Sequence, residues 1–312
     1  MGIASDHPMF NPSSFYLHTP MAEALSDFVL TTMWCGHPGG YVLGLPRQGK
    51  STACLGLTRT LETRAGERVM VHRVVVSPRD RMTIAGILKN ICFALNLSPS
   101  QRATADDMVS TIVYFLTDSA CINSARHVVL LVDEFQRLSK DQLACFSELY
   151  DKLHIMNVNL KVFFIGNHSE SMELLNSLDK AHFQHIKQRF FMHEHRFWGI
   201  RTFDELAACM QFYDEPYGLE NEHEAMSKSA APKDFEEGWR FKDLATSVWA
   251  VYNENYAHPL GLKSLGMQYF VAVMATLLAD FIPRYGVCGE MDGFISNAFE
   301  ISGIGSSQVF LA

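Results

Sequence analysis

The sequence has few cysteines, and their arrangement suits neither a disulfide framework nor a metal cluster. It contains 7 cysteines in 312 residues, an odd number without any CxxC pair. A reducing compartment is the simpler interpretation, and most of these thiols are expected to be small buried groups. The densest histidine group is His193-Glu194-His195, which we interpret as incidental rather than as a metal site.

Long apolar runs and sorting signals are also missing. No apolar stretch reaches the length of about 20 residues that spans a bilayer. The first residues lack the charged and apolar regions of a signal peptide. We therefore expect no membrane partner. The 48% apolar composition supports one large domain, or a core domain with a smaller one.

Charge is distributed unevenly along the chain. The first 150 residues carry 13 basic and 13 acidic side chains, and the rest carry 13 basic and 21 acidic ones, which gives the net charge of −8. Residues 59–102 hold 8 basic side chains and 3 acidic ones. An acidic protein is a poor general binder of nucleic acid, but such a local excess can bind phosphate.

Strand and helix patterns alternate over the first 165 residues. Apolar runs predict strands at residues 41–43, 68–76, 127–132 and 160–165. Helical spacing predicts helices at residues 22–33, 52–61, 83–95, 104–117 and 140–153, with Thr104 as an N-cap. This alternation predicts a parallel α/β sheet.

After about residue 200 the helical pattern dominates. Helices are predicted at residues 241–256, 262–281 and 290–299, and an acidic loop is predicted at residues 213–240. The expected organisation is an α/β domain (1–205), an acidic insertion (206–239), a helical domain (240–302) and a flexible tail (303–312). The tail ends in Val309-Phe-Leu311, which either docks a partner or is disordered.

A glycine-rich loop follows the first predicted strand and opens a helix. It reads Gly44-Leu-Pro-Arg-Gln-Gly49-Lys50-Ser51. Glycines let backbone N–H groups wrap phosphates, Lys50 reaches the outer phosphates, and the Ser51 hydroxyl ligates magnesium. The expected nucleotide-binding residues are Gly44, Leu45, Pro46, Arg47, Gln48, Gly49, Lys50, Ser51, Thr52 and Asp133.

Two acids end the third predicted strand. Asp133 and Glu134 follow an apolar run, so their carboxylates are expected at the carboxyl edge of the sheet. Asp133 would hold Mg²⁺ together with Ser51, and Glu134 would act as general base for an attacking water. The alternative is a solvated strand end, which the glycine-rich loop disfavours.

Two further residues are candidates for catalysis. Asn167 follows the fourth predicted strand, where it either orients the lytic water or belongs to an ordinary turn. Arg189 either acts on a neighbouring subunit's nucleotide as an arginine finger or is a surface charge.

With these elements in order, the chain resembles the AAA+ ATPases. The resemblance implies a P-loop core whose parallel β-sheet is sandwiched by helices, followed by a small helical lid. Within that superfamily it resembles the transposon target-selection group of TnsC, TniB and MuB, most of all TnsC of CRISPR-associated Tn7-like transposons. The supporting residues are Phe15-Tyr-Leu-His-Thr-Pro20, Val75-Val-Ser-Pro-Arg-Asp-Arg81, Val132-Asp-Glu-Phe-Gln136 and Phe164-Ile-Gly-Asn-His168.

The resemblance implies a function and a set of partners. Such proteins bind ATP with Mg²⁺, assemble as homo-oligomeric rings or filaments on double-stranded DNA, and bridge target-site recognition to the transposase. The implied partners are TnsA- and TnsB-like transposase subunits and a TniQ-like adaptor, in the cytoplasm of a bacterium. Arg79, Arg81 and Lys89 are the DNA-binding candidates. The alternative is that Arg79 and Arg81 pair with Asp80 or other local acids.

The sequence differs from many relatives at two places, and it leaves two alternative functions. Where many relatives carry a lid arginine this chain has Lys263, and where they often have Gly-Gln-Pro it has Gly166-Asn167-His168. One rival is an ATP-binding scaffold without significant hydrolysis. The other is a loader or signalling ATPase that acts on a protein rather than on DNA.

Overall fold

The computed structural model describes residues 7–10, 16–78, 83–217, 223–287 and 289–305. The chain forms two compact units. The α/β unit comprises residues 22–46 and 50–197, and the helical unit comprises residues 1–21, 47–49 and 198–312. The described N-terminal residues, 7–10 and 16–21, therefore group with the helical unit, whereas the sequence analysis places them in the first domain.

The core of the α/β unit is one parallel sheet of five strands. Their order across the sheet is β2-β3-β4-β1-β5. The strands are β1 (Gly39–Gly44), β2 (Met70–Val75), β3 (His127–Asp133), β4 (Asn159–Asn167) and β5 (Glu194–Arg196). The four predicted strands are confirmed, and β5 is an addition that the sequence analysis missed.

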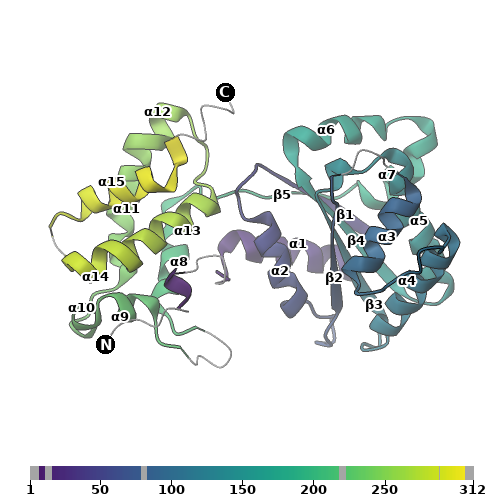
Figure 1. Ribbon diagram of the computed structural model, residues 1–312, viewed down its shortest axis with the longest axis horizontal. Coiled ribbons are helices and arrows are strands. Elements are labelled where there is room, and N and C mark those ends of the chain that lie inside the picture. The colour runs from purple at the N-terminus through teal and green to yellow at the C-terminus, as the bar shows by residue number, and fades with distance from the viewer. Residues whose placement is uncertain (1–6, 11–15, 79–82, 218–222, 288, 306–312) are drawn as a thin grey trace. The chain divides into compact units, whose positions relative to one another are not determined.

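Helices cover both faces of this sheet (Figure 1). Helices α1 and α2 lie on one face, and α3, α4, α5 and α7 pack on the other. The helices are α1 (Pro20–Trp34), α2 (Lys50–Thr60), α3 (Ile84–Ala94), α4 (Ala105–Ala120), α5 (Lys140–Ile155), α6 (His168–Ser177) and α7 (Gln184–Phe190). The predicted parallel sheet sandwiched by helices is thus confirmed, while α6 and α7 were not predicted.

Strand β3 shows why the sheet forms where it does. All residues from Val128 to Asp133 are buried, because alternate side chains enter the two helical layers. The helix starts also follow local chemistry. Thr104 caps α4 in a capping box with Asp107, as predicted for the N-cap, and Ser139 caps α5 in the same way with Gln142.

The helical unit consists of short helices. They are η1 (Pro8–Phe10), α8 (Phe203–Gln211), η5 (Phe212–Asp214), α9 (Met226–Ala230), α10 (Pro232–Glu236), η7 (Phe241–Leu244), α11 (Ala245–Tyr252), η8 (Asn253–Ala257), α12 (His258–Leu260), α13 (Met267–Thr276), η9 (Leu277–Phe281), α14 (Ile282–Tyr285) and α15 (Met291–Ser302). The stretch predicted as an acidic loop contains α9 and α10. Within the described ranges, no helix has both the length and the apolar character to cross a membrane.

Two predicted helices of this unit are interrupted for identifiable reasons. A π turn, η8 or η9, stands directly before each of the helices that carry Pro259 and Pro283 near their starts. A proline ring clashes with the carbonyl four residues earlier, and a widened turn relieves that clash. The helix predicted from residue 262 begins only at Met267, because Gly261 is left-handed and Gly266 is extended.

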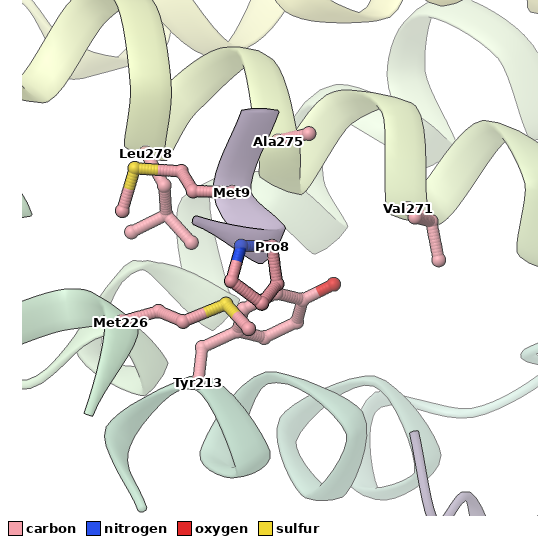
Figure 2. A pocket seen from close by; sticks show the side chains of 7 residues that line it. All are labelled: Pro8, Met9, Tyr213, Met226, Val271, Ala275 and Leu278. Carbon is pink, nitrogen blue, oxygen red and sulfur yellow. The ribbon is translucent and has the colours of Figure 1, made fainter. Parts of the chain in front are cut away.

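The segment Pro8–Phe10 is anchored in the helical unit by Met9. The Met9 side chain is 3% exposed, and Figure 2 shows it beside Leu278, with Met226 and Tyr213 close by. These residues line an apolar cavity of about 10 Å³, together with Pro8, Val271 and Ala275. Such a cavity is about as large as one water molecule, so it reflects packing rather than a ligand site.

We predict that Met9→Ala lowers the free energy of unfolding of the helical unit by about 2–4 kcal/mol, because a buried side chain is lost and a cavity remains. Chemical denaturation followed by tryptophan fluorescence measures the change, since Trp239 and Trp249 lie in this unit. Phe10→Ala is the matched control, because Phe10 is 50% exposed and its removal should cost less than about 0.5 kcal/mol. Equal effects of the two variants would contradict the anchoring role of Met9.

Candidate nucleotide-binding site

Three strands of the α/β unit end at the same edge of the sheet. Gly44 at the end of β1 is in register with Asn167 at the end of β4, and Asp133 at the end of β3 is in register with Ile165 of β4. The strand order therefore brings together the glycine-rich loop, the two acids and Asn167. In open α/β sheets this carboxyl edge is where ligands bind.

The glycine-rich loop turns sharply before α2. Arg47 and Gly49 have positive φ angles of 65° and 91°, and α2 begins at the next residue, Lys50. Successive backbone N–H groups in such a turn, followed by a helix N-terminus, form a concave site for an anion. Leu45 and Pro46 are exposed, and so is Thr52 on the first turn of α2.

The tip of the loop, residues 47–49, groups with the helical unit. The Arg47 guanidinium donates a hydrogen bond to the Tyr269 hydroxyl, and the Gln48 amide donates one of 3.4 Å to the Ser264 hydroxyl. Gln48 is 5% exposed. These two predicted nucleotide-binding residues therefore have polar partners on the helical unit.

The Lys50 ammonium lies over the start of its own loop. Its Nζ donates hydrogen bonds of 3.0 Å to the Gly44 carbonyl and 2.6 Å to the Leu45 carbonyl. Burial lowers the pKa of Lys50 below its ordinary value, and the nearby carboxylates of Asp133 and Glu134 act in the opposite direction. A cation held in this loop is placed to bind phosphate oxygens.

Asp133 is the most enclosed acid of the site. It is 2% exposed, and its Oδ2 accepts hydrogen bonds from the Ser51 hydroxyl at 2.8 Å and from an Arg73 nitrogen at 2.6 Å. Because Ser51 donates its proton to Asp133, the lone pairs of its oxygen remain available to a cation. Hydroxyl and carboxylate oxygens are ligands that Mg²⁺ prefers, so this donor set fits magnesium.

Sequence reasoning missed Arg73, which comes from β2. The available signal was a charged residue in the middle of an apolar strand that is covered by helices. Such a charge needs a partner, because an unpaired charge inside a protein is costly. Asp133 is that partner.

Glu134 has a different environment from the adjacent Asp133. Its φ of 62° places the backbone in the left-handed region, and its side chain is 34% exposed. The Glu134 Oε2 accepts a hydrogen bond of 2.9 Å from Gln136 and lies 3.1 Å from an Arg137 nitrogen. The carboxylate of the predicted general base is therefore tied to its own turn.

Asn167 belongs to a hydrogen-bonded group at the same edge. Its side-chain amide donates to Glu170 at 2.9 Å, and its backbone N–H donates to Gln136 at 3.3 Å. Gln136 also donates to Glu170 at 3.2 Å. The polar group that sequence reasoning expected beside the acids is thus present, and Gln136 and Glu170 extend it.

Arg189 lies on α7 and contacts α5 of its own chain. Its guanidinium lies 3.0 Å from Asp151, donates to the Ser147 carbonyl at 3.2 Å and covers the Tyr150 ring at 4.7 Å. Lys187 on the same helix pairs with Asp179. In the isolated chain, therefore, Arg189 stabilises the packing of α7 on α5.

Of the three DNA-binding candidates, Lys89 lies among the described residues. Arg79 and Arg81 lie outside the described residues, as does the tail segment 309–311. Lys89 is exposed on α3, with its ammonium 5.7 Å from the centre of the Phe93 ring. Lys263 is exposed between α12 and α13 of the helical unit.

The histidine group around residue 194 lies on and beside β5. The His193 ring packs on His37 at 4.0 Å between centroids, and the His195 ring stacks on Phe28 at 5.2 Å. Among the described residues, no three or more His, Cys, Asp or Glu side chains are grouped so that they can hold a metal ion.

Fold and site together define an α/β protein with the P-loop fold of the AAA+ type. Residues 36–175 match the family model described as AAA domain, and this range includes the loop, both acids and Asn167. This part of the chain is therefore similar to an AAA domain, and the residues after the α/β unit are mostly helical.

Several solved structures are similar to the chain at low sequence identity. Cdc6p from Pyrobaculum aerophilum is 17% identical, over 98% of this chain and 86% of that one, with a TM-score of 0.45. ORC1 from Aeropyrum pernix, solved in complex with DNA, is 16% identical over 95% and 87%, with a TM-score of 0.45. A chain of Drosophila ORC bound to DNA is 13% identical over 87% and 39%, with a TM-score of 0.43. No curated protein matches the sequence.

We predict that Lys50→Ala weakens the binding of Mg²⁺-ATP by about tenfold to a hundredfold, or about 1.4–2.7 kcal/mol, because the phosphates lose a positive charge. Isothermal titration calorimetry measures the affinity. Lys152→Ala is the matched control, since its exposed pair with Glu148 at 2.9 Å contributes little. Unchanged affinity of Lys50→Ala would show that phosphates bind elsewhere.

Proposed function

We propose that the protein is an ATPase that assembles on double-stranded DNA and regulates transposition by linking target-site recognition to a transposase. The observation that carries the ATP-binding part is the contact of 2.8 Å between Ser51 and Asp133, beside the Lys50 ammonium. The part about DNA and transposition is supported by the sequence motifs and by their resemblance to the TnsC, TniB and MuB group.

The site residues have distinct proposed roles in ATP hydrolysis. The amides of residues 44–51 and the N-terminus of α2 bind the phosphates, and Lys50 neutralises their outer charge. Ser51, supported by Asp133, would hold Mg²⁺, which supplies charge stabilisation when bound. Glu134 accepts a proton from the attacking water, and Asn167 orients that water.

Assembly places further demands on Arg189 and on the basic residues. If Arg189 acts on a neighbouring subunit's nucleotide, it must leave its ion pair with Asp151. Lys89, with the exposed ring of Phe93 beside it, offers the DNA backbone a cation on the surface of α3. A ring or filament repeats such contacts in every subunit, which explains how an acidic protein binds DNA.

Transposase subunits and a TniQ-like adaptor are the proposed protein partners. A bacterial cytoplasm is the proposed location. ATP binding would favour the assembly on DNA, and hydrolysis would favour its release.

One observation favours a second candidate, an ATP-dependent scaffold without significant hydrolysis. The Glu134 carboxylate bonds to Gln136 and Arg137, so it must break these contacts before it activates a water. A chain that keeps them in the assembled state binds ATP and hydrolyses it slowly.

The rate of ATP hydrolysis by the Glu134→Gln variant, compared with that of the wild type, distinguishes the ATPase from the scaffold. For an ATPase we expect phosphate release to fall by about a hundredfold or more, with the affinity for ATP nearly unchanged, because only the proton acceptor is lost. Phosphate release in the presence of DNA measures this rate. The same rate in the variant and in the wild type would support the scaffold.

For DNA binding, we predict that the combined variant Arg79→Ala and Arg81→Ala loses affinity for nonspecific duplex by about tenfold or more, while ATP affinity is unchanged. Fluorescence anisotropy at several salt concentrations measures both the affinity and its salt dependence. The wild type should weaken steeply as salt rises, and the variant should show a shallower slope.

Lys89→Ala tests the described α3 surface in the same assay, with Lys152→Ala as the control. A wild type that binds no duplex, with or without ATP, would favour a loader or signalling ATPase that acts on a protein.

A further inference from the structure

Arg73 is the charged side chain that lies closest to the proposed metal-binding residues without belonging to either of the two motifs. It projects from β2, and its nitrogen is 2.6 Å from Asp133 Oδ2. The same oxygen accepts the Ser51 hydroxyl at 2.8 Å. One carboxylate oxygen thus receives one charged donor and one neutral donor.

The ion pair between Arg73 and Asp133 is largely buried, so the attraction between the two charges is only weakly screened by water. The Asp133 side chain is 3% exposed and the Arg73 side chain 22% exposed. Arg73 Nε is buried and has no hydrogen-bond partner among the described residues, so the contact with Asp133 is the main polar contact of this guanidinium. Without Arg73, the buried Asp133 carboxylate would lose its direct ion-pair partner, which is costly.

The other charges of the site are already engaged. Glu134 is paired with Arg137, and the Lys50 ammonium donates to two carbonyls of its own loop. Arg73 is therefore the cation in direct contact with Asp133, and the Lys50 ammonium is a second cation nearby. In the proposed function, Asp133 is the acid that supports Mg²⁺ through Ser51.

We propose that Arg73 is a positioning residue that supplies positive charge beside Asp133 and so lets the triphosphate bind with a reduced dependence on Mg²⁺. This inference rests on the proposed ATP binding. With Arg73 present, Asp133 is neutralised and remains oriented toward Ser51, so the phosphates approach a site that does not repel them. Without Arg73, the carboxylate repels a metal-free triphosphate, whereas a bound divalent cation screens that repulsion.

The experiment measures the affinity for a non-hydrolysable ATP analogue by calorimetry, once in excess Mg²⁺ and once in excess EDTA. The quantity compared is the ratio of the two dissociation constants, metal-free over Mg²⁺. For Arg73→Gln we expect this ratio to rise by about tenfold relative to the wild type. Arg73→Lys keeps the charge and should stay within about threefold of the wild type.

Arg68→Gln is the matched control, because it removes an equal charge from an exposed residue just before the amino end of the same strand. Its ratio should equal that of the wild type. A purely structural role of Arg73 would weaken binding equally in both conditions and leave the ratio unchanged, which would overturn the inference. An unchanged affinity in both conditions would overturn it as well.

A double variant keeps the inference testable if Arg73→Gln alone folds poorly. Arg73→Gln combined with Asp133→Asn removes both charges and with them the repulsion, so we expect the double variant still to bind the metal-free analogue. Loss of metal-free binding in a folded double variant would contradict the inference. Failure of the wild type to bind the analogue in Mg²⁺ would instead contradict the proposed function itself.

Discussion

The candidate site depends on one buried carboxylate. Asp133 is the last residue of β3, at the carboxyl edge of the sheet. Its carboxylate accepts hydrogen bonds from the Ser51 hydroxyl and from the Arg73 guanidinium. These three residues come from α2, β2 and β3, so their contact requires the strand order that the parallel sheet adopts. An unpaired carboxylate at this depth would destabilise the fold, and the pairing therefore serves stability and function together.

The two adjacent acids illustrate how strongly local structure separates side chains that look equivalent in the sequence. Asp133 completes the β3 ladder and faces the α2 layer, while the left-handed backbone of Glu134 turns its side chain toward Gln136 and Arg137. One acid is enclosed and neutralised by Arg73. The other is partly exposed, and it must exchange partners before it can accept a proton.

Much of the α/β unit could be predicted because the signals are local. Apolar β-branched runs predicted strands β2, β3 and β4, and the glycine loop predicted the junction of β1 with α2. The short strand β5 was missed because Glu194-His-Arg196 has no apolar run, and it forms by pairing with β1. In the helical unit, the effect of Pro259 and Pro283 on the turns before them could not be read from periodicity alone.

The site was predictable in its motifs but not in its contacts. The motif spacing identified Lys50, Ser51 and Asp133, because residues that bind phosphate and magnesium occupy fixed positions at or just after the ends of strands. Arg73 could not be assigned, since nothing in the sequence shows which buried charge its strand will face. The same holds for Gln136 and Glu170, whose bonds with Asn167 depend on the packing of α6 and the turn after β3.

The most direct test of the central claim is an experimental structure of the protein with a non-hydrolysable ATP analogue and Mg²⁺. The account predicts density for the phosphates along the amides of residues 44–51, with the metal at the Ser51 hydroxyl and Asp133 behind it. Phosphates bound at any other surface, or a metal remote from Ser51, would contradict the account.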